Sequence, residues 1–198
     1  MKTSSERIKG LVQSDIRAMT IECIRKQGIN LGQGLCETET PESVIKTAQE
    51  SLGKKDRNLY SSPEGIAPLR NKIVEKLKRE NRITADPQTE IVVTHGATGG
   101  YASALMALLD PGDGILFFQP YYGYHVNAAI LAQLEAQYVP FTSLDAEVTA
   151  SVLESAVKPN TKAIVVCTPN NPSGKMWTEK EIGALADLFL CSSHLFCD

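Results

Sequence analysis

The chain has 198 residues, of which 42% are hydrophobic and 22% are charged, and its formal net charge at pH 7 is -3. This length and composition are typical of one substantial globular domain with a single core. Because basic residues are not in excess, nucleic-acid binding has no electrostatic support. No apolar run approaches the length of a membrane span, and the amino terminus lacks the apolar segment of a secretory signal. We therefore expect neither a membrane protein nor a secreted one.

The cysteine and histidine residues predict neither a disulfide framework nor a metal site. The five cysteines form no CxxC pair, and their odd number favours reduced thiols in a cytoplasmic protein. The three histidines, His95, His125 and His194, lack the spacing of metal ligands. We interpret them as polar or packing residues.

The first ninety residues predict helices that are joined by polar segments. An arm precedes a short helix over 15–25, and an extended piece, INLGQG, follows it. Apolar residues at helical spacing predict further helices over 41–52 and 67–80, with the polar loop KKDRNLYSSPEG between them.

From residue 91 onward, predicted strands and helices alternate. Apolar runs predict strands over 91–94, 114–119, 136–141, 162–167 and, in HLFCD, 194–198. Helical spacing predicts helices over 98–109, 122–133, 149–157 and 178–189, the last opened by a capping box of Thr178 and Glu181. This alternation predicts an α/β fold with a mostly parallel sheet and helices on both faces.

Sheets of this kind bind ligands beyond the carboxyl ends of their strands, so the residues that follow each predicted strand are the candidates for a site. The first candidate is HGATGG at 95–100. Glycines that open a helix leave backbone N–H groups facing an anion, and Thr98 adds a hydroxyl, which favours a phosphate. The motif is neither a Walker loop nor a GxGxxG fingerprint, and a purely structural turn is the alternative.

Three further candidates follow the later strands. Tyr122 in PYYGY has a ring that could stack on a planar ligand, or simply pack in the core. Asn171 in TPNNPSG precedes a proline, which holds it extended and limits the orientations of its amide, although an Asn-Pro turn can be only a turn. Asp198 places a carboxylate where a pyridinium nitrogen would be stabilised, or it is a solvated terminal residue. Together the candidates match the groups that pyridoxal phosphate needs.

In chain order, the motifs resemble the class I/II aminotransferases of fold type I, which use pyridoxal phosphate. The similar segments cover nearly the whole chain: NLGQGLCETETPESV, NLYSSPEGIAPLR, VVTHGATGGYASALMALLDPGD, QPYYGY, CTPNNPSGKMWTEKE and the final FCD. The resemblance implies a three-layer α/β/α large domain, incomplete over 41–198, preceded over 1–40 by an arm and the start of the small domain. It also implies transamination between an L-amino acid and a 2-oxo acid, carried out by a homodimer.

The resemblance also implies roles for single residues around the cofactor. Ala97, Thr98 and Gly99 would hold the phosphate, Ala97 through its backbone alone. Tyr122 would stack on the ring, and Asn171 would contact the ring oxygen O3′ and neighbour the substrate carboxylate.

The same resemblance implies roles for three more residues and cis peptide bonds at prolines. Asp198 would pair with the pyridine nitrogen, and Gly34 would line the substrate site. Tyr60 would reach the cofactor phosphate of a neighbouring subunit. Cis peptide bonds are expected before Pro120, Pro172 or both, since cis bonds are nearly confined to X-Pro.

The Schiff-base lysine of the family lies beyond its aspartate, and no lysine here has that setting, so we expect no catalytic residue in this chain and no transamination by it alone. We interpret Lys175 as a solvated first-turn residue. A tyrosine and two arginines that belong to the family site are also missing. The alternatives are another fold-type I reaction (a C–S lyase, a decarboxylase-like enzyme or a synthase), a non-catalytic truncated protein that keeps the cofactor scaffold, and a nucleotide-binding domain, against which the missing glycine fingerprint counts.

Overall fold

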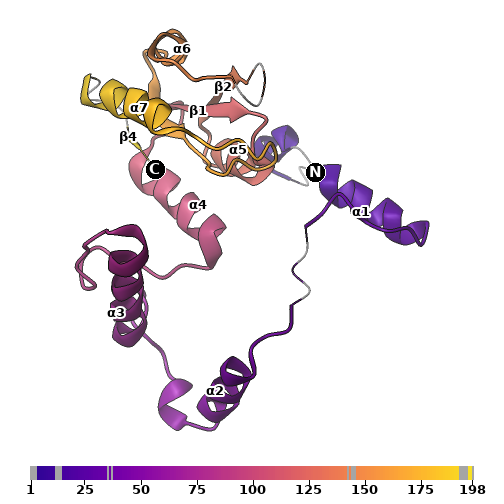
Figure 1. Cartoon of the computed structure of the whole chain (residues 1–198), viewed down its shortest axis with the longest axis vertical. Helices are drawn as coiled ribbons and strands as arrows, with labels where there is room; N and C mark the ends of the chain where they lie inside the picture. The colour runs from indigo at the N-terminus through magenta and orange to yellow at the C-terminus, as the bar shows by residue number, and fades with distance from the viewer. Residues whose placement is uncertain are drawn as a thin grey trace. The chain divides into compact units, whose positions relative to one another are not determined.

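The computed structural model describes residues 4–11, 15–34, 36, 38–141, 143, 146–191 and 196–197 (Figure 1). The chain forms two compact units, residues 1–15 with 97–198 and residues 16–96. The predicted domain boundary at residue 40 stays a prediction. No helix in the described part of the chain is both long enough and apolar enough to cross a membrane.

The first unit contains a parallel sheet in the order β2-β1-β3-β4. Its strands are β1 (Gly114–Gln119), β2 (Glu135–Pro140), β3 (Thr161–Val165) and β4 (Phe196–Cys197). The predicted strands over 114–119, 136–141 and 162–167 are confirmed within two residues at each end. Of the predicted strand over 194–198, only 196–197 lies in the described residues. Because every pair of strands is parallel, their carboxyl ends share one edge.

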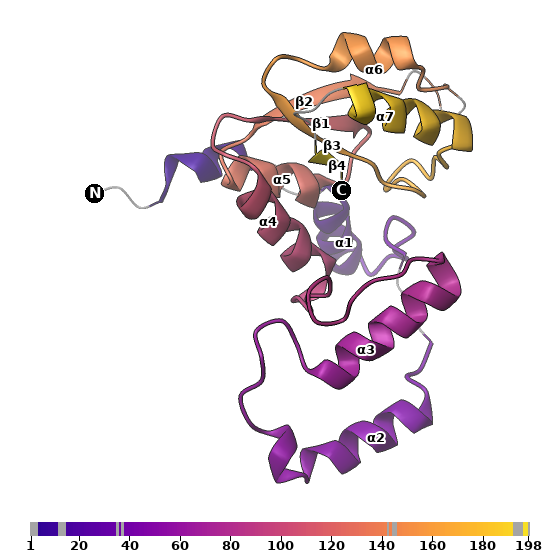
Figure 2. The same ribbon diagram turned by 90° about the vertical axis from the view of Figure 1, so that its left-hand side faces the viewer.

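Helices cover both faces of this sheet, as predicted. They are α4 (Gly96–Leu108), α5 (Gly123–Leu131), α6 (Ala150–Ala156) and α7 (Glu179–Cys191). Figures 1 and 2 show α4 and α5 on one side of the sheet and α6 and α7 on the other. A short 3-10 helix that was not predicted, η1 (Glu6–Gly10), packs against α5. The three-layer α/β/α architecture is thereby confirmed.

Strand β1 supplies both halves of the core, because successive residues of a strand point to opposite faces. Ile115 and Phe117 pack with α4 and α5, in a cluster completed by Leu105, Leu109, Val126, Ala129, Leu134 and Ala163. Leu116 and Phe118 pack with α6 and α7, in a cluster completed by Val139, Val148, Leu153, Ile164, Trp177 and Leu185. This two-sided burial explains why the sequence of β1 is a continuous apolar run.

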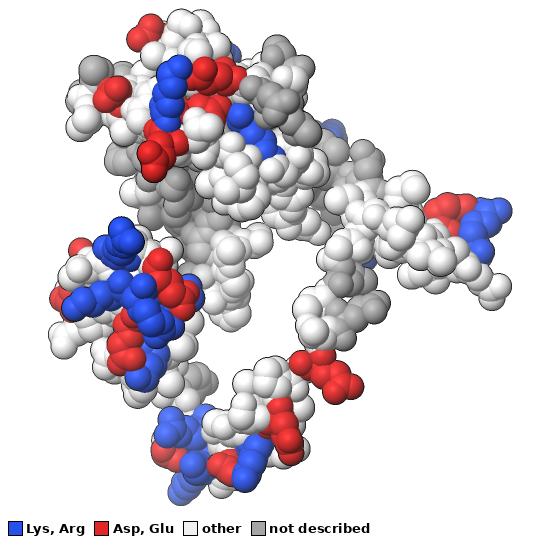
Figure 3. All heavy atoms as spheres, viewed as in Figure 1, with Lys and Arg blue, Asp and Glu red and all other residues white. Residues whose placement is uncertain are grey.

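The second unit is mostly helical. Its elements are α1 (Asp15–Arg25), α2 (Glu42–Leu52), η2 (Lys55–Arg57), α3 (Ala67–Lys76) and η3 (Leu77–Asn81), a turn of π-helix that ends the predicted helix over 67–80. On the face shown in Figure 3, acidic and basic side chains are mixed over α2 and α3. Many large apolar side chains of this unit are exposed, and Leu31 keeps 91% of its surface accessible.

Residues 91–94 do not form the predicted strand. Among the described residues, no strand pairs with this segment, and Val93 donates its backbone N–H to Glu64 in a loop (2.9 Å). Val92 is 64% exposed. An apolar run becomes a strand only where a neighbouring strand completes its hydrogen-bond ladder, and none does so here.

Candidate functional site

The carboxyl ends of β1 and β3 bring two of the sequence motifs to one edge of the sheet. The two strands are parallel neighbours, and Phe117 pairs with Val165 in register. The motif PYYGY begins directly after β1, at Pro120. The motif TPNNPSG follows β3 after Val166 and Cys167. Both motifs therefore leave the sheet at the same edge, as predicted.

The two adjacent asparagines of the turn over 168–174 have different roles. Asn170 is buried: its N–H donates to the Lys175 carbonyl (2.8 Å), and its carbonyl accepts from the Gly174 N–H (2.7 Å). Its side-chain oxygen accepts from the Ser173 hydroxyl (2.8 Å). Gly174 has a φ of 73°, a conformation that glycine adopts most readily. Asn170 thus closes the turn, and Asn171 projects from it with an exposed side chain.

The peptide bonds at Gln119–Pro120 and Asn171–Pro172 are cis, which confirms the prediction for both prolines. The bond at Thr168–Pro169 is also cis and was not predicted.

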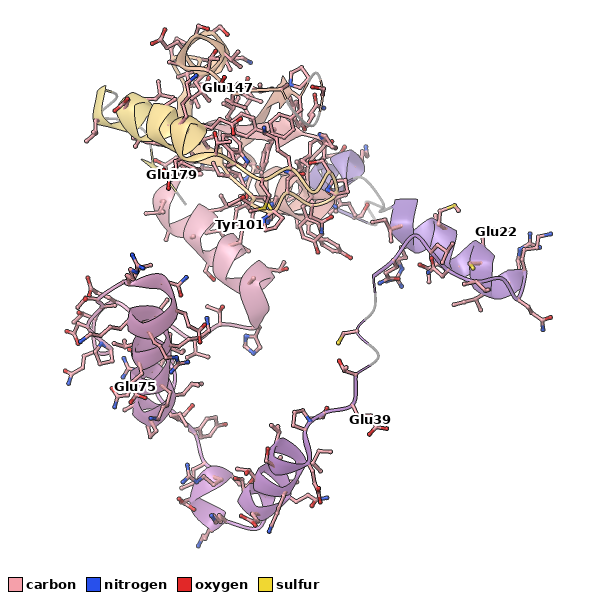
Figure 4. All side chains as sticks on the ribbon, viewed as in Figure 1. Glu22, Glu39, Glu75, Tyr101, Glu147 and Glu179 are labelled. Carbon is pink, nitrogen blue, oxygen red and sulfur yellow. The ribbon has the colours of Figure 1, made fainter. Side chains whose placement is uncertain are left out.

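Tyr122 is linked to α4 through aromatic contacts. It is the capping residue of α5, and its ring meets His125 edge-on, with 5.1 Å between the ring centroids. His125 in turn lies 4.7 Å from the ring of Tyr101, which projects from α4 (Figure 4). Tyr101 is one helical turn beyond Thr98, so these contacts hold Tyr122 close to the first turn of α4. The spacing of Tyr122 and His125, three residues apart, was a signal that sequence reasoning left unused.

The first turn of α4 is exposed. The helix begins at Gly96, and Ala97 and Thr98 are exposed while Gly99 is half-buried. The first N–H groups of a helix have no acceptor within the helix, and the helix dipole makes this end attractive to anions. Three of the predicted phosphate-binding residues are therefore placed together at an open helix terminus.

Lys175 is not solvated, contrary to the prediction. Its side chain is only 5% exposed and forms an ion pair with Glu181, which is 1% exposed, at 2.9 Å between Nζ and Oε1. The ammonium also donates to the carbonyl of Ala146 (2.9 Å) and lies 5.3 Å from the ring centre of Phe141. Sequence position could not show this, because the partners come from other segments of the chain.

The Glu181 carboxylate accepts hydrogen bonds from three segments. Burial raises its pKa, but the backbone N–H groups of Thr178 and Val148, the Lys175 ammonium and the Thr178 hydroxyl together outweigh burial and lower the pKa to about 2. The Thr178 N–H donates to Oε2 (2.8 Å) and the Glu181 N–H donates to the Thr178 hydroxyl (3.2 Å), which confirms the predicted capping box.

The remaining predicted residues belong to the second unit or lie outside the described residues. Gly34 and Tyr60 belong to the second unit, where both are exposed. Asp198 lies outside the described residues. A search of the described residues found no cluster of His, Cys, Asp and Glu that could hold a metal ion.

The sequence matches a model of one protein family, described as aminotransferase class I and II, over residues 26–198. It is 30% identical over 181 residues to a probable N-succinyldiaminopimelate aminotransferase of Mycobacterium tuberculosis, covering 88% of this chain and 44% of that protein. It is also 30% identical over 210 residues to an aspartate/prephenate aminotransferase of Thermus thermophilus, covering 99% of this chain and 54% of the relative.

Solved structures show the same relationship. The N-succinyldiaminopimelate aminotransferase of Mycobacterium tuberculosis superposes with a TM-score of 0.89 at 28% identity, over 98% of this chain and 51% of that chain. The chain thus spans about half the length of the curated relatives it matches.

Proposed function

Because the chain belongs to the class I and II aminotransferase family, we propose that it forms the amino-terminal part of a pyridoxal phosphate-dependent aminotransferase. The whole protein would transfer an amino group between an L-amino acid and a 2-oxo acid. One observation carries the proposal: an aromatic ring, Tyr122, and an exposed amide, Asn171, follow neighbouring parallel strands at the same edge of the sheet. Contacts through His125 and Tyr101 link Tyr122 to α4 near its first turn. The relatives are named for different amino acids, so the proposal covers the reaction and not one substrate.

The residues at this edge fit the parts of pyridoxal phosphate. The first turn of α4 offers N–H donors and the Thr98 hydroxyl to a phosphate. Tyr122 offers a ring whose position is fixed by packing on His125. Asn171 offers an amide whose neighbouring turn is closed by hydrogen bonds. Asp198, which follows β4 in the sequence, is proposed to pair with the ring nitrogen.

Each residue has a defined task in this proposal. Pyridoxal phosphate, when bound, supplies an electron-withdrawing ring that stabilises negative charge at the substrate Cα. The α4 terminus fixes the anionic end, and Tyr122 limits tilting of the ring. Asn171 donates a hydrogen bond to the ring oxygen and lies next to the substrate carboxylate. A carboxylate at Asp198 favours the protonated ring nitrogen.

Two further proposals concern the assembly and its location. We propose a homodimer in which Tyr60 reaches the cofactor phosphate of the neighbouring subunit and Gly34 lines the substrate site. The complete exposure of Tyr60 supports this assignment, because its ring is accessible to a partner. Cytoplasmic location is proposed from the odd number of cysteines and their lack of a CxxC pair.

The test is a binding titration of the 198-residue chain with pyridoxal phosphate, measured by equilibrium dialysis. We expect one saturable site per chain, and weaker binding of pyridoxal, which lacks the phosphate. Asn171→Ala should weaken binding by about 10-fold, because it removes one hydrogen bond to a polar ring oxygen.

Asn160→Ala is the matched control, since Asn160 lies just before β3, at the opposite edge of the same sheet, and its loss should leave binding unchanged. Absence of saturable binding, or equal binding by the Asn171→Ala variant, would contradict the proposal. Displacement of the ligand by AMP at equal concentration would favour a nucleotide site instead.

A further inference from the structure

We propose that Lys175 and Glu181 form a positioning pair that holds the 170–175 turn, and with it Asn171, against residues 146–148. The inference rests on the proposed function in one respect, because Asn171 is the residue that would meet the cofactor. The pair itself touches no proposed ligand, so its role is to fix the turn.

Lys175 connects the turn to the rest of the unit in two ways. Its main-chain carbonyl accepts from the Asn170 N–H (2.8 Å), which closes the turn around Asn171. Its side chain donates to the carbonyl of Ala146 (2.9 Å) and pairs with Glu181. A movement of Lys175 would therefore disturb the hydrogen bond from Asn170 that closes the turn.

Glu181 completes the connection from α7. Its Oε1 accepts from the Val148 N–H (2.9 Å), and its Oε2 accepts from the N–H (2.8 Å) and the hydroxyl (3.0 Å) of Thr178. Three segments, the turn, residues 146–148 and the start of α7, thus meet at one buried carboxylate. No oxygen of that carboxylate is left without a donor.

Burial of this ion pair is not explained by stability alone. Apolar side chains of similar volume often stabilise a core as well as a buried ion pair does, because desolvation cancels most of the attraction. The pair adds directional contacts: the ammonium donates to two acceptors, the Ala146 carbonyl and Glu181, and the carboxylate accepts from four donors. Directional contacts of this kind set one geometry for the turn.

The chain offers a matched exposed pair. Lys180 on α7 pairs with Glu147 at 2.6 Å, so it joins two of the same segments, but its side chain is 79% exposed. Glu147, labelled in Figure 4, precedes α6 in the sequence. Exposed pairs contribute little, so Lys180→Met is the control for Lys175→Met.

The first experiment measures amide hydrogen exchange in the 198-residue chain. The exchange rates of the Asn170 and Gly174 amides are each divided by the exchange rate of the Leu116 amide in β1. A loss of global stability raises all of these rates and therefore cancels in the ratio. We expect Lys175→Met to raise this ratio at least 10-fold and Lys180→Met to leave it unchanged. Lys175→Arg, which keeps the charge, should restore most of the protection. An unchanged ratio in Lys175→Met overturns the inference.

The second experiment links the pair to Asn171 through pyridoxal phosphate affinity. Lys175→Met should weaken binding about as much as Asn171→Ala does, and the double variant should be no weaker than Asn171→Ala, because both act through one contact. Additive losses would show that Lys175 acts elsewhere. If the unchanged chain does not bind pyridoxal phosphate, the proposed function fails, while selective exchange at Asn170 and Gly174 still supports the positioning role.

Discussion

Replacing Glu181 with glutamine should destabilise the protein in a way that depends on pH. The substitution keeps the size of the side chain and removes the negative charge that Lys175 and the backbone N–H groups stabilise. The folded protein lowers the pKa of Glu181 from 4.5 to about 2. A depressed pKa means that the carboxylate contributes stability above its unfolded pKa and loses that contribution as the pH falls through the folded value.

The pKa change sets the size of the effect. At about 1.4 kcal/mol per pH unit, a fall from 4.5 to about 2 corresponds to roughly 3 kcal/mol at pH 7. That agrees with the loss of about 3–5 kcal/mol that is typical when one partner of a buried ion pair is removed. The contribution should be whole above pH 4.5 and should fall between pH 4.5 and 2, with about 1.4 kcal/mol left at pH 3.

Urea unfolding measures this contribution directly. The chain has a single tryptophan, Trp177, which is buried beside the pair, so its fluorescence follows unfolding of the relevant unit. The Glu181→Gln variant and the unchanged chain should be compared at pH 7, 5 and 3, with the exposed Glu147→Gln as a control that shifts no midpoint. A loss below about 1 kcal/mol at pH 7, or an equal loss at pH 7 and pH 3, would refute the reasoning.

Three further substitutions test the packing, each by the change in the free energy of urea unfolding. Gly114→Ala should cost about 2 kcal/mol, because the new Cβ would overlap the Gln137 amide and come within 3.0 Å of the Asn160 carbonyl; a neutral result would mean that β1 and β2 can shift apart. Gly183→Ala should stabilise by about 0.5–1 kcal/mol, since it lies inside α7 and nothing would be within 4 Å of the added methyl group; destabilisation would contradict the described environment. Leu153→Ala should cost about 2–5 kcal/mol, because this side chain is 0% exposed between α6 and the sheet, and a smaller loss would show that the site collapses around the cavity.

Features that depend on local sequence could be predicted. The capping box of Thr178 and Glu181 needs only a spacing of three residues and is present. The run over 114–119 is apolar on both faces, so its place at the centre of the sheet followed from its composition. Asn171 was singled out because prolines restrict the backbone around it, and the exposed amide agrees with that reasoning.

Features that depend on residues distant in the sequence could not be predicted. The run over 91–94 has the composition of a strand, but strand formation requires a neighbour that composition does not supply. Lys175 follows a glycine turn, which favours exposure, yet Ala146 and Glu181 surround it. The contact of His125 with Tyr101 joins two helices, and neither helix carries a local sign of it.

The apolar side chains left exposed in the second unit have a thermodynamic consequence. Ile24, Leu31 and Leu52 are each more than 70% accessible. Any association that covers them would release ordered water and lower the heat capacity. Such an association should weaken on cooling. The heat-capacity change of association, measured by calorimetry at several temperatures, would therefore report how much of this apolar surface is covered.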